Sequence, residues 1–207
     1  MKINMDPAGV VIVTPVYEDT EASSRLFKEL ASSLGSAIYI VAVDDGSVRE
    51  PVDIKSIEAA GLQGVVLKLK RNVGHQRAIA IGLGYVADEI IGTKKIVIMD
   101  SDGEDLPESI HALLAFYIVY KWLFSLLTGQ KISFGNFMAL TPKAAQRLVA
   151  MQELWVHIAG CVLTSKLRIH TLPLDRGPRY AGQSKMNFVG LALHGFKGLM
   201  VFAEEVL

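Results

Sequence analysis

The chain has 207 residues, of which 51% are apolar and 20% are charged, and its 21 basic and 21 acidic residues give a formal net charge of zero. This length indicates one domain with room for a short appendage, the apolar fraction is enough for a sizeable core, and the zero net charge argues against a nucleic-acid partner. The lone Cys161 excludes an internal disulfide and fits a reducing compartment.

Three further features bear on location. The N-terminus lacks the basic, apolar and small-residue pattern of a signal peptide. The mean hydropathy of +0.34 is high for a soluble protein. The sequence contains no stretch of ~20 uninterrupted apolar residues, so it does not predict a membrane-spanning helix. Contact with a membrane surface is therefore compatible with the sequence.

In the first half of the chain, short β-branched runs alternate with segments of helical spacing. A strand, a helix and a strand make a βαβ unit, which implies a parallel sheet with a right-handed crossover. We expect the first strand to stop at Pro15, because proline cannot continue a central ladder. The predicted elements are a strand at 10–14, a helix at 21–34, a strand at 37–43, a short irregular helix within 49–63, a strand at 65–69, a turn at 71–75, a helix at 76–91 and a strand at 96–99.

The second half is less regular. Residues 108–128 form one helical run without Gly or Pro, which looks like two helices joined near Ala115–Phe116, with a loop deleted or left out. A catalytic domain is expected over 1–185 and a C-terminal amphipathic, interfacial helix over 186–207. The other predicted elements are a strand within 132–140, a helix from Pro142, a helix at 154–163, a strand at 167–174 and a basic loop at 176–185.

Two carboxylates follow the strand at 96–99. Asp100 and Asp102 are two residues apart, so on extended backbone they would point the same way. Adjacent carboxylates repel unless a cation lies between them, and hard oxygen ligands suit Mg²⁺ or Mn²⁺. Glu104 could supply a third oxygen. The alternative is that these acids only cap the next helix, which would begin near Pro107.

A second acidic strand end weakens that alternative. Asp44 and Asp45 end the strand at 37–43, and the carboxyl ends of parallel strands share the edge where open α/β sheets bind ligands. Pro15 and Tyr17 end the first strand at the same edge. An aromatic ring, acids for a ribose and a metal site together describe a nucleotide-diphosphate pocket. No Gly-x-Gly-x-x-Gly follows the first strand, so the usual dinucleotide fold is not indicated.

Five pieces of the sequence, taken in order, resemble family-2 inverting glycosyltransferases, especially polyprenyl-phosphate sugar transferases similar to dolichol-phosphate mannose synthase. The pieces are residues 14–19, 43–47, 71–75, 99–108 and 179–185. The resemblance implies a GT-A fold, a Rossmann-like, mostly parallel central sheet flanked by helices. It covers nearly the whole chain, although Asp19 stands where the family usually has Glu, and Glu104 where lipid-sugar synthases commonly have Gln.

The resemblance also implies residue roles. Asp100 and Asp102 would be the Asp-x-Asp pair that holds Mg²⁺ or Mn²⁺ on the donor diphosphate, with Glu104 as a further metal ligand. Arg179 and Lys185 would reach the leaving diphosphate and offset its growing charge. The residues expected to bind the nucleotide sugar are Pro15, Tyr17, Asp19, Asp44, Asp45, Arg71 and Ser101.

The implied reaction is a single displacement that moves a sugar from a UDP- or GDP-linked donor to a polyprenyl-phosphate-type lipid, in an enzyme on the cytoplasmic, inner face of the membrane. A lipid phosphate needs no general base, whereas a sugar hydroxyl in surface polysaccharide synthesis would. A non-catalytic nucleotide-sugar or lipid binder is the third possibility. The Gly-rich apolar face of the helix expected at 186–207 would suit a homo-oligomer contact. His75 and Asn136 stay open between a site role and a turn, and His157 is expected to be a core histidine.

Overall fold

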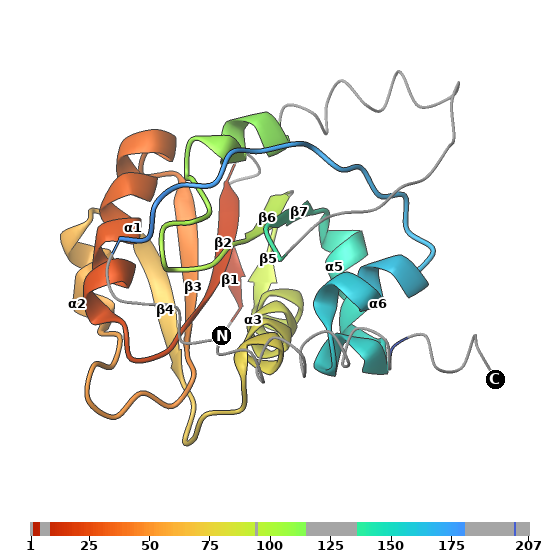
Figure 1. The fold of residues 1–207 in the computed structure, drawn as a ribbon, viewed down its shortest axis with the longest axis horizontal. Coiled ribbons are helices and arrows are strands. Elements are labelled where there is room, and N and C mark those ends of the chain that lie inside the picture. Colours follow the sequence, from red (N-terminus) through yellow and green to blue (C-terminus); the bar gives the residue numbers. More distant parts are fainter. Residues whose placement is uncertain (1, 5–8, 94, 115–135, 181–200, 202–207) are drawn as a thin grey trace.

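A computed structural model of the chain describes residues 2–4, 9–93, 95–114, 136–180 and 201. A five-stranded sheet lies at its centre, in the spatial order β4-β3-β2-β6-β7 (Figure 1). The pairs between β4, β3, β2 and β6 are parallel, and β7 runs antiparallel to β6. The predicted α/β class with a mostly parallel, helix-flanked sheet is confirmed.

The helices and strands follow the predicted order closely in the first half of the chain. A small parallel pair, β1 with β5, was not predicted. The elements are β1 (Ile3–Asn4), β2 (Val10–Val16), α1 (Thr20–Leu34), β3 (Ile38–Asp44), α2 (Ile54–Ala59), β4 (Gln63–Lys68), α3 (His75–Glu89), β5 (Ile90–Ile91), β6 (Lys95–Ile98), β7 (Met138–Leu140), α5 (Pro142–Val149), the 3₁₀ turn η1 (Gln152–Trp155) and α6 (Ile158–Thr164).

The sheet is buried on both faces, and the side chains of β2 alternate between two hydrophobic clusters. Val11 and Val13 face the cluster that includes residues of α3, α5 and α6, whereas Ile12 packs in the cluster with residues of α1 and α2. Gly82 of α3 lies so close that a Cβ there would be 2.5 Å from Val13 Cγ1. Small residues thus let α3 pack directly against the sheet, as its composition predicts.

Three expectations about elements are wrong. The first strand does not stop at Pro15, which pairs with Val43 inside the β2–β3 ladder. The β2–β6 ladder ends at the pair Val13–Ile98, before Pro15. No residue of β6 therefore pairs with Pro15, and the lack of an N–H on proline breaks no ladder hydrogen bond on that side. The segment 167–174 is not a strand, because no neighbouring strand pairs with it in the described part of the sheet. The helix at 154–163 is split into η1 and α6, with His157 as the N-cap of α6 rather than a core residue.

Several expectations fall outside the described residues. They are the junction near Ala115–Phe116, most of the helical run 108–128, the start of the strand within 132–140, Lys185 and almost all of the tail helix at 186–207. Among the described helices, none combines the length and the hydrophobicity that crossing a bilayer requires.

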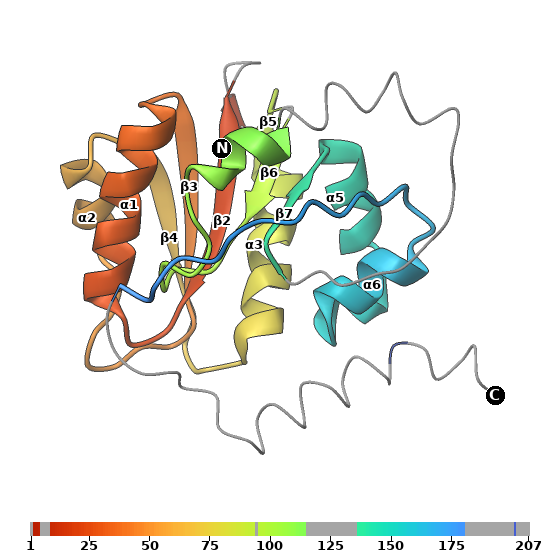
Figure 2. The same ribbon diagram turned by 45° about the horizontal axis from the view of Figure 1, so that its top comes forward.

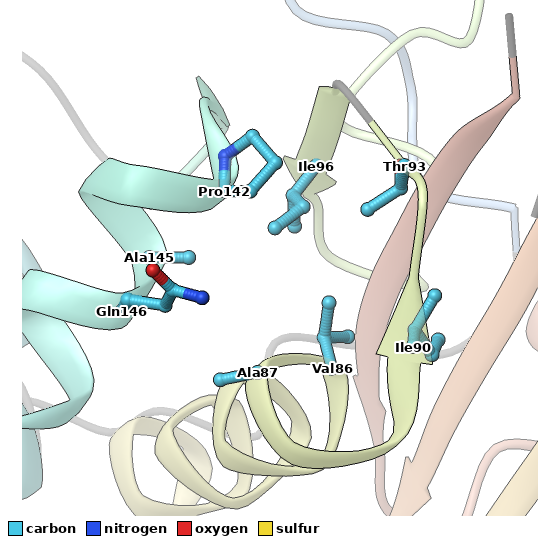
Figure 3. A pocket seen from close by; sticks show the side chains of 8 residues that line it. All are labelled: Val86, Ala87, Ile90, Thr93, Ile96, Pro142, Ala145 and Gln146. Carbon is cyan, nitrogen blue, oxygen red and sulfur yellow. The ribbon is translucent and has the colours of Figure 1, made fainter. Parts of the chain in front are cut away.

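A small hollow opens between α3, the β5–β6 connection and α5 (Figure 3). It lies beside the start of β6, away from the end of that strand where the acids follow, and none of its side chains is charged. The lining residues are Val86, Ala87, Ile90, Thr93, Ile96, Pro142, Ala145 and Gln146. The hollow therefore belongs to the packing of α5 against α3 and has no acid or cation to bind a charged ligand.

Candidate active site

The acid loop, residues 99–105, follows β6 at the carboxyl edge of the sheet. It is not extended, so the expectation that Asp100 and Asp102 point the same way by strand alternation does not apply. Hydrogen bonds within the loop hold its shape: the Asp100 N–H donates to Asp105 Oδ2 (2.8 Å), and the Glu104 N–H donates to Asp102 Oδ1 (3.1 Å). Gly103 makes the turn with a positive φ of 89°.

Asp105 is a member of this loop that the sequence reading passed over. Its side chain is buried, and burial together with the charge of Asp100 raises its pKa to about 7, although the Asp100 N–H opposes the rise. Burial likewise raises the pKa of Asp102. Carboxylates packed this closely disfavour further negative charge, so the loop attracts cations.

The predicted basic loop lies directly on these acids. Arg179 spans two of them, with Nη1 2.8 Å from Asp102 Oδ2 and Nε 2.8 Å from Glu104 Oε1. Arg176 Nη2 lies 2.5 Å from Glu104 Oε2. The backbone adds two bonds, from Gly177 N–H to the Glu104 carbonyl (3.0 Å) and from Tyr180 N–H to the Asp102 carbonyl (2.7 Å). The structure therefore brings the predicted Arg179, Asp102 and Glu104 together.

Tyr180 anchors this segment to α1. Its hydroxyl donates to Glu29, and the Arg25 guanidinium lies 4.4 Å from the centre of its ring. A Cβ on Gly103 would be 2.6 Å from the same ring, so the turn of the acid loop must be glycine. In Figure 2 this stretch passes from α6 across the loop after β6 toward α1. Sequence reading gave no sign of the contact between Tyr180 and Glu29.

On the other side of the acid loop, a chain of side-chain amides reaches His75. The Ile158 N–H donates to Gln76 Oε1 (2.7 Å), and Gln76 Nε2 donates to Asn136 Oδ1 (3.1 Å). Asn136 Nδ2 then lies 3.0 Å from His75 Nε2, and because its amide orientation is fixed by this chain, it is the donor there. The direction of donation along this relay, which links Ile158, Gln76, Asn136 and His75, is set by the Ile158 N–H, because that group can only donate.

His75 Nε2 also lies 3.2 Å from Asp100 Oδ1, a buried oxygen that accepts no other hydrogen bond in the described structure. Burial opposes protonation of His75, but its hydrogen bond to Asp100 and the charges of Asp100, Asp102 and Asp45 raise its pKa above the usual value. A protonated His75 imidazole forms an ion pair with Asp100 at this place. His75, left open by the sequence, is thus in the site.

The second acidic strand end has a structural role that was not predicted. Asp44 is buried, and its two oxygens accept the N–H groups of Ser47 (2.8 Å) and Val52 (3.1 Å). Asp45 is also buried and accepts the N–H groups of Val73 (2.7 Å) and Gly74 (3.0 Å). Burial raises the pKa of Asp45, although these backbone bonds oppose the rise. Both acids therefore shape the loops at the carboxyl edge.

The remaining predicted site residues lie at or near the same edge with different exposure. Tyr17 is 42% exposed, and Pro15 and Ser101 are buried. Asp19 caps α1 by accepting the Ala22 N–H at 3.4 Å. Arg71 is exposed, and its backbone packs so tightly on Gly46 that a Cβ there would be 2.3 Å away.

Glu18 closes the loops beside Tyr17 and was not singled out from the sequence. Its carboxylate accepts the N–H groups of Val48, Arg49 and Glu50, and these bonds lower its pKa. Its own N–H donates to Ser47 Oγ at 2.8 Å. The loops after β2 and β3 are therefore tied to each other around the exposed Tyr17 ring.

The acid loop has the donor chemistry of a hard cation site, but its carboxylates are not arranged around one point. Within the described residues, no group of three or more His, Cys, Asp or Glu side chains stands ready to hold a metal ion. Asp100 Oδ1 is nevertheless a buried oxygen that faces His75 alone among the described residues, and carboxylate oxygens are the ligands that Mg²⁺ and Mn²⁺ prefer. The residues fit a divalent ion once Arg179 moves from Asp102.

Residues 11–121 match the model of glycosyl transferase family 2, which is more than half of the chain. The chain belongs to this family. Over 111 residues it is 33% identical to the undecaprenyl-phosphate 4-deoxy-4-formamido-L-arabinose transferase of Enterobacter sp. (strain 638) and 32% identical to that of Salmonella paratyphi B. These matches cover 51% of the chain but only 32% of each relative, so the chain matches about a third of the length of these curated relatives.

Two solved structures are similar to parts of this family 2 member. S. aureus TarS (residues 1–349, in complex with UDP-GlcNAc) has a TM-score of 0.42 and 19% identity over 55% of the chain and 31% of that protein. The mannosyltransferase PcManGT from Pyrobaculum calidifontis, in complex with GDP-Man and Mn²⁺, has a TM-score of 0.36 and 16% identity over 47% and 29%. Both scores are low, so the family assignment rests on the sequence match.

The family match covers both acidic strand ends, and it stops before Arg176 and Arg179. The contact between residues 176–180 and the acid loop therefore lies partly outside the matched segment.

Proposed function

We propose that this chain carries the donor site of a metal-dependent, inverting glycosyltransferase, which moves a sugar from a nucleoside-diphosphate sugar to a polyprenyl phosphate. The observation that carries the proposal is the acid loop inside the family 2 match, with Asp100 Oδ1 buried beside His75 on one side and Arg179 on the other.

The nucleoside would lie at the carboxyl edge beside the exposed Tyr17 ring, between the loops that Asp44, Asp45 and Glu18 hold in place. In this proposal the two buried aspartates act through the loops that they shape, because each of their oxygens already accepts a backbone N–H. Base and sugar identity would then depend on backbone groups of these loops.

Asp100, Asp102 and Glu104 are the residues that would hold the divalent ion. When bound, the ion would neutralise the charge on the diphosphate and so make it a better leaving group. Arg179 supplies a second cation at the same place, where its guanidinium can bind phosphate oxygens in a bidentate manner. Both cations offset negative charge that grows as the glycosidic bond breaks.

The acceptor proposal rests on the relatives, which are named as undecaprenyl-phosphate transferases. A lipid phosphate is an anion at neutral pH, so the transfer needs no general base, and the positive mean hydropathy of +0.34 is compatible with work at a membrane surface. The proposed acceptor lies in the membrane, and the proposed nucleotide-sugar donor is cytoplasmic. The proposed location is therefore the inner face of the membrane, where the two can meet.

The test combines a donor screen with a transfer assay. A panel of UDP- and GDP-sugars with Mn²⁺ is screened by thermal shift, since a bound ligand raises the apparent stability. The selected donor, radiolabelled in its sugar, is then incubated with undecaprenyl phosphate in detergent, and the lipid extract is counted. We expect label in the lipid phase with the wild-type protein and none with Asp102→Asn.

Asp88→Asn is the matched control, because Asp88 is exposed near the end of α3 and lies outside the acid loop. It should transfer sugar as the wild type does. Label in a water-soluble glycan would move the acceptor to a sugar hydroxyl. Donor binding without turnover in any acceptor would overturn the enzymatic proposal, and full transfer by Asp102→Asn would overturn the role of the acid loop.

A further inference from the structure

The carboxylates of the acid loop are not equally open to a cation. Asp102 and Glu104 are engaged by Arg179 and Arg176, whereas Asp100 Oδ1 faces no arginine in the described residues and has His75 Nε2 at 3.2 Å. The two arginines balance the two acids that they contact. The site thus contains its own counter-cations at the place where a divalent ion would bind.

The position of Arg179 is fixed by more than its side chain. The backbone bonds of Gly177 and Tyr180 to the acid loop place residues 176–180 alongside it, and a Cβ on Gly177 would be 2.4 Å from Leu106 Cδ2. The Tyr180 ring is held by Arg25 and Glu29. Because the backbone is tied at both ends, the Arg179 guanidinium can leave Asp102 by turning about its own side-chain bonds while the segment stays in place.

We propose that Arg179 is an exchangeable internal counter-cation, which a divalent ion displaces from Asp102 and Glu104 and which then binds the diphosphate that the ion brings. This rests on the proposed function and adds an order to it. A metal ion alone has to break the two Arg179 contacts, whereas an ion that arrives with a diphosphate offers the guanidinium a new anionic partner. Binding of the ion and of the diphosphate is therefore positively coupled through one side chain.

The exchange predicts opposite effects of one substitution in two titrations. In the first, Mn²⁺ alone is added and the free ion is measured by electron paramagnetic resonance. Arg179→Ala should bind Mn²⁺ about fivefold more tightly than the wild type, because it removes a competing, partly exposed ion pair. In the second, the preformed Mn²⁺–pyrophosphate complex is added, and Arg179→Ala should bind it about fivefold or more weakly, because a phosphate partner is lost.

Further variants separate exchange from simpler roles. Arg179→Lys keeps the positive charge but loses the planar guanidinium that can bind two oxygens at once. Its affinity should lie between those of the wild type and Arg179→Ala in both titrations. Arg77→Ala removes the same charge from an exposed position on α3 and should match the wild type. Thermal unfolding of each variant shows whether it is folded.

The outcomes are distinguishable. Weaker binding of Arg179→Ala in both titrations, or a change only with Mn²⁺–pyrophosphate, would overturn the exchange and leave Arg179 as a structural or phosphate-binding residue. Absence of Mn²⁺ binding in the wild type under both conditions would instead overturn the metal dependence in the proposed function. Tighter Mn²⁺ binding together with weaker Mn²⁺–pyrophosphate binding supports the exchange.

Discussion

Gln76 offers a direct test of the relay that reaches His75. Its side chain is 6% exposed, accepts the Ile158 N–H at 2.7 Å and donates to Asn136 at 3.1 Å. Gln76→Leu replaces the amide with an apolar side chain of similar size in α3 and removes both bonds. The Ile158 N–H is then buried without an acceptor, and the Asn136 amide loses one partner.

The expected cost follows from these two losses. An unsatisfied buried N–H costs about 1–3 kcal/mol, and a lost neutral hydrogen bond costs about 1 kcal/mol, so the free energy of unfolding should fall by roughly 2–4 kcal/mol. For a chain of this size, 1 kcal/mol corresponds to about 2–4 °C in Tm, so Tm should fall by roughly 4–16 °C. The change is large because the Gln76 side chain is buried, so water cannot replace the bonds that are lost.

The assay is urea and thermal unfolding followed by circular dichroism. Gln146→Leu is the matched control, since Gln146 is exposed on α5 and its substitution should stay within about 0.5 kcal/mol of the wild type. Native-state amide exchange should also speed up at Ile158 in Gln76→Leu. If Gln76→Leu unfolds like the control, the relay contributes nothing measurable and the argument for its polarity fails.

Two other expectations use packing and burial. Gly82→Ala should destabilise the protein by about 1–3 kcal/mol in urea unfolding, because its Cβ would be 2.5 Å from Val13 Cγ1, whereas Gly84→Ala in the same helix meets nothing within 4 Å and should stabilise it by up to about 1 kcal/mol. Similar signs for both glycines would contradict the close approach of α3 to β2. Burial raises the pKa of the Cys161 thiol to about 12, so iodoacetamide at pH 8 should alkylate the native protein about a thousandfold more slowly than the urea-unfolded chain, as mass spectrometry would measure. Because the pKa of Cys161 is higher in the folded state, the stability that comes from burying the neutral thiol is complete below the unfolded pKa of about 8.5 and declines as the pH rises toward 12. Rapid alkylation at neutral pH would show that α6 is not packed as described.

The first half of the fold could be predicted from the sequence because its signals are local. The helix α1 begins after Asp19, which accepts the Ala22 N–H, and it ends at Gly35, whose φ is 73°. The central strands β2 and β3 are apolar runs that are buried on both faces, and the acids that follow β3 and β6 mark the carboxyl edge. Each of these features can be read within a window of a few residues.

The wrong expectations share a different cause, which is that a neighbour decides the outcome. Residues 167–174 alternate like a strand, but strands need a partner, and none pairs with them in the described sheet. Pro15 was expected to end a strand, but the ladder on that side of β2 has already ended at Val13. A propensity gives the range of possible structures, and the tertiary position then selects one.

The same distinction applies to the site. Sequence motifs identify Asp100 and Asp102 as adjacent acids, and they identify a basic loop much later in the chain, but they do not say whether these charges meet. In the structure they do meet, and Arg179 then competes for the carboxylates that a metal ion would use. A charge pattern that looks like an open metal site in the sequence is therefore a partly neutralised one in the fold.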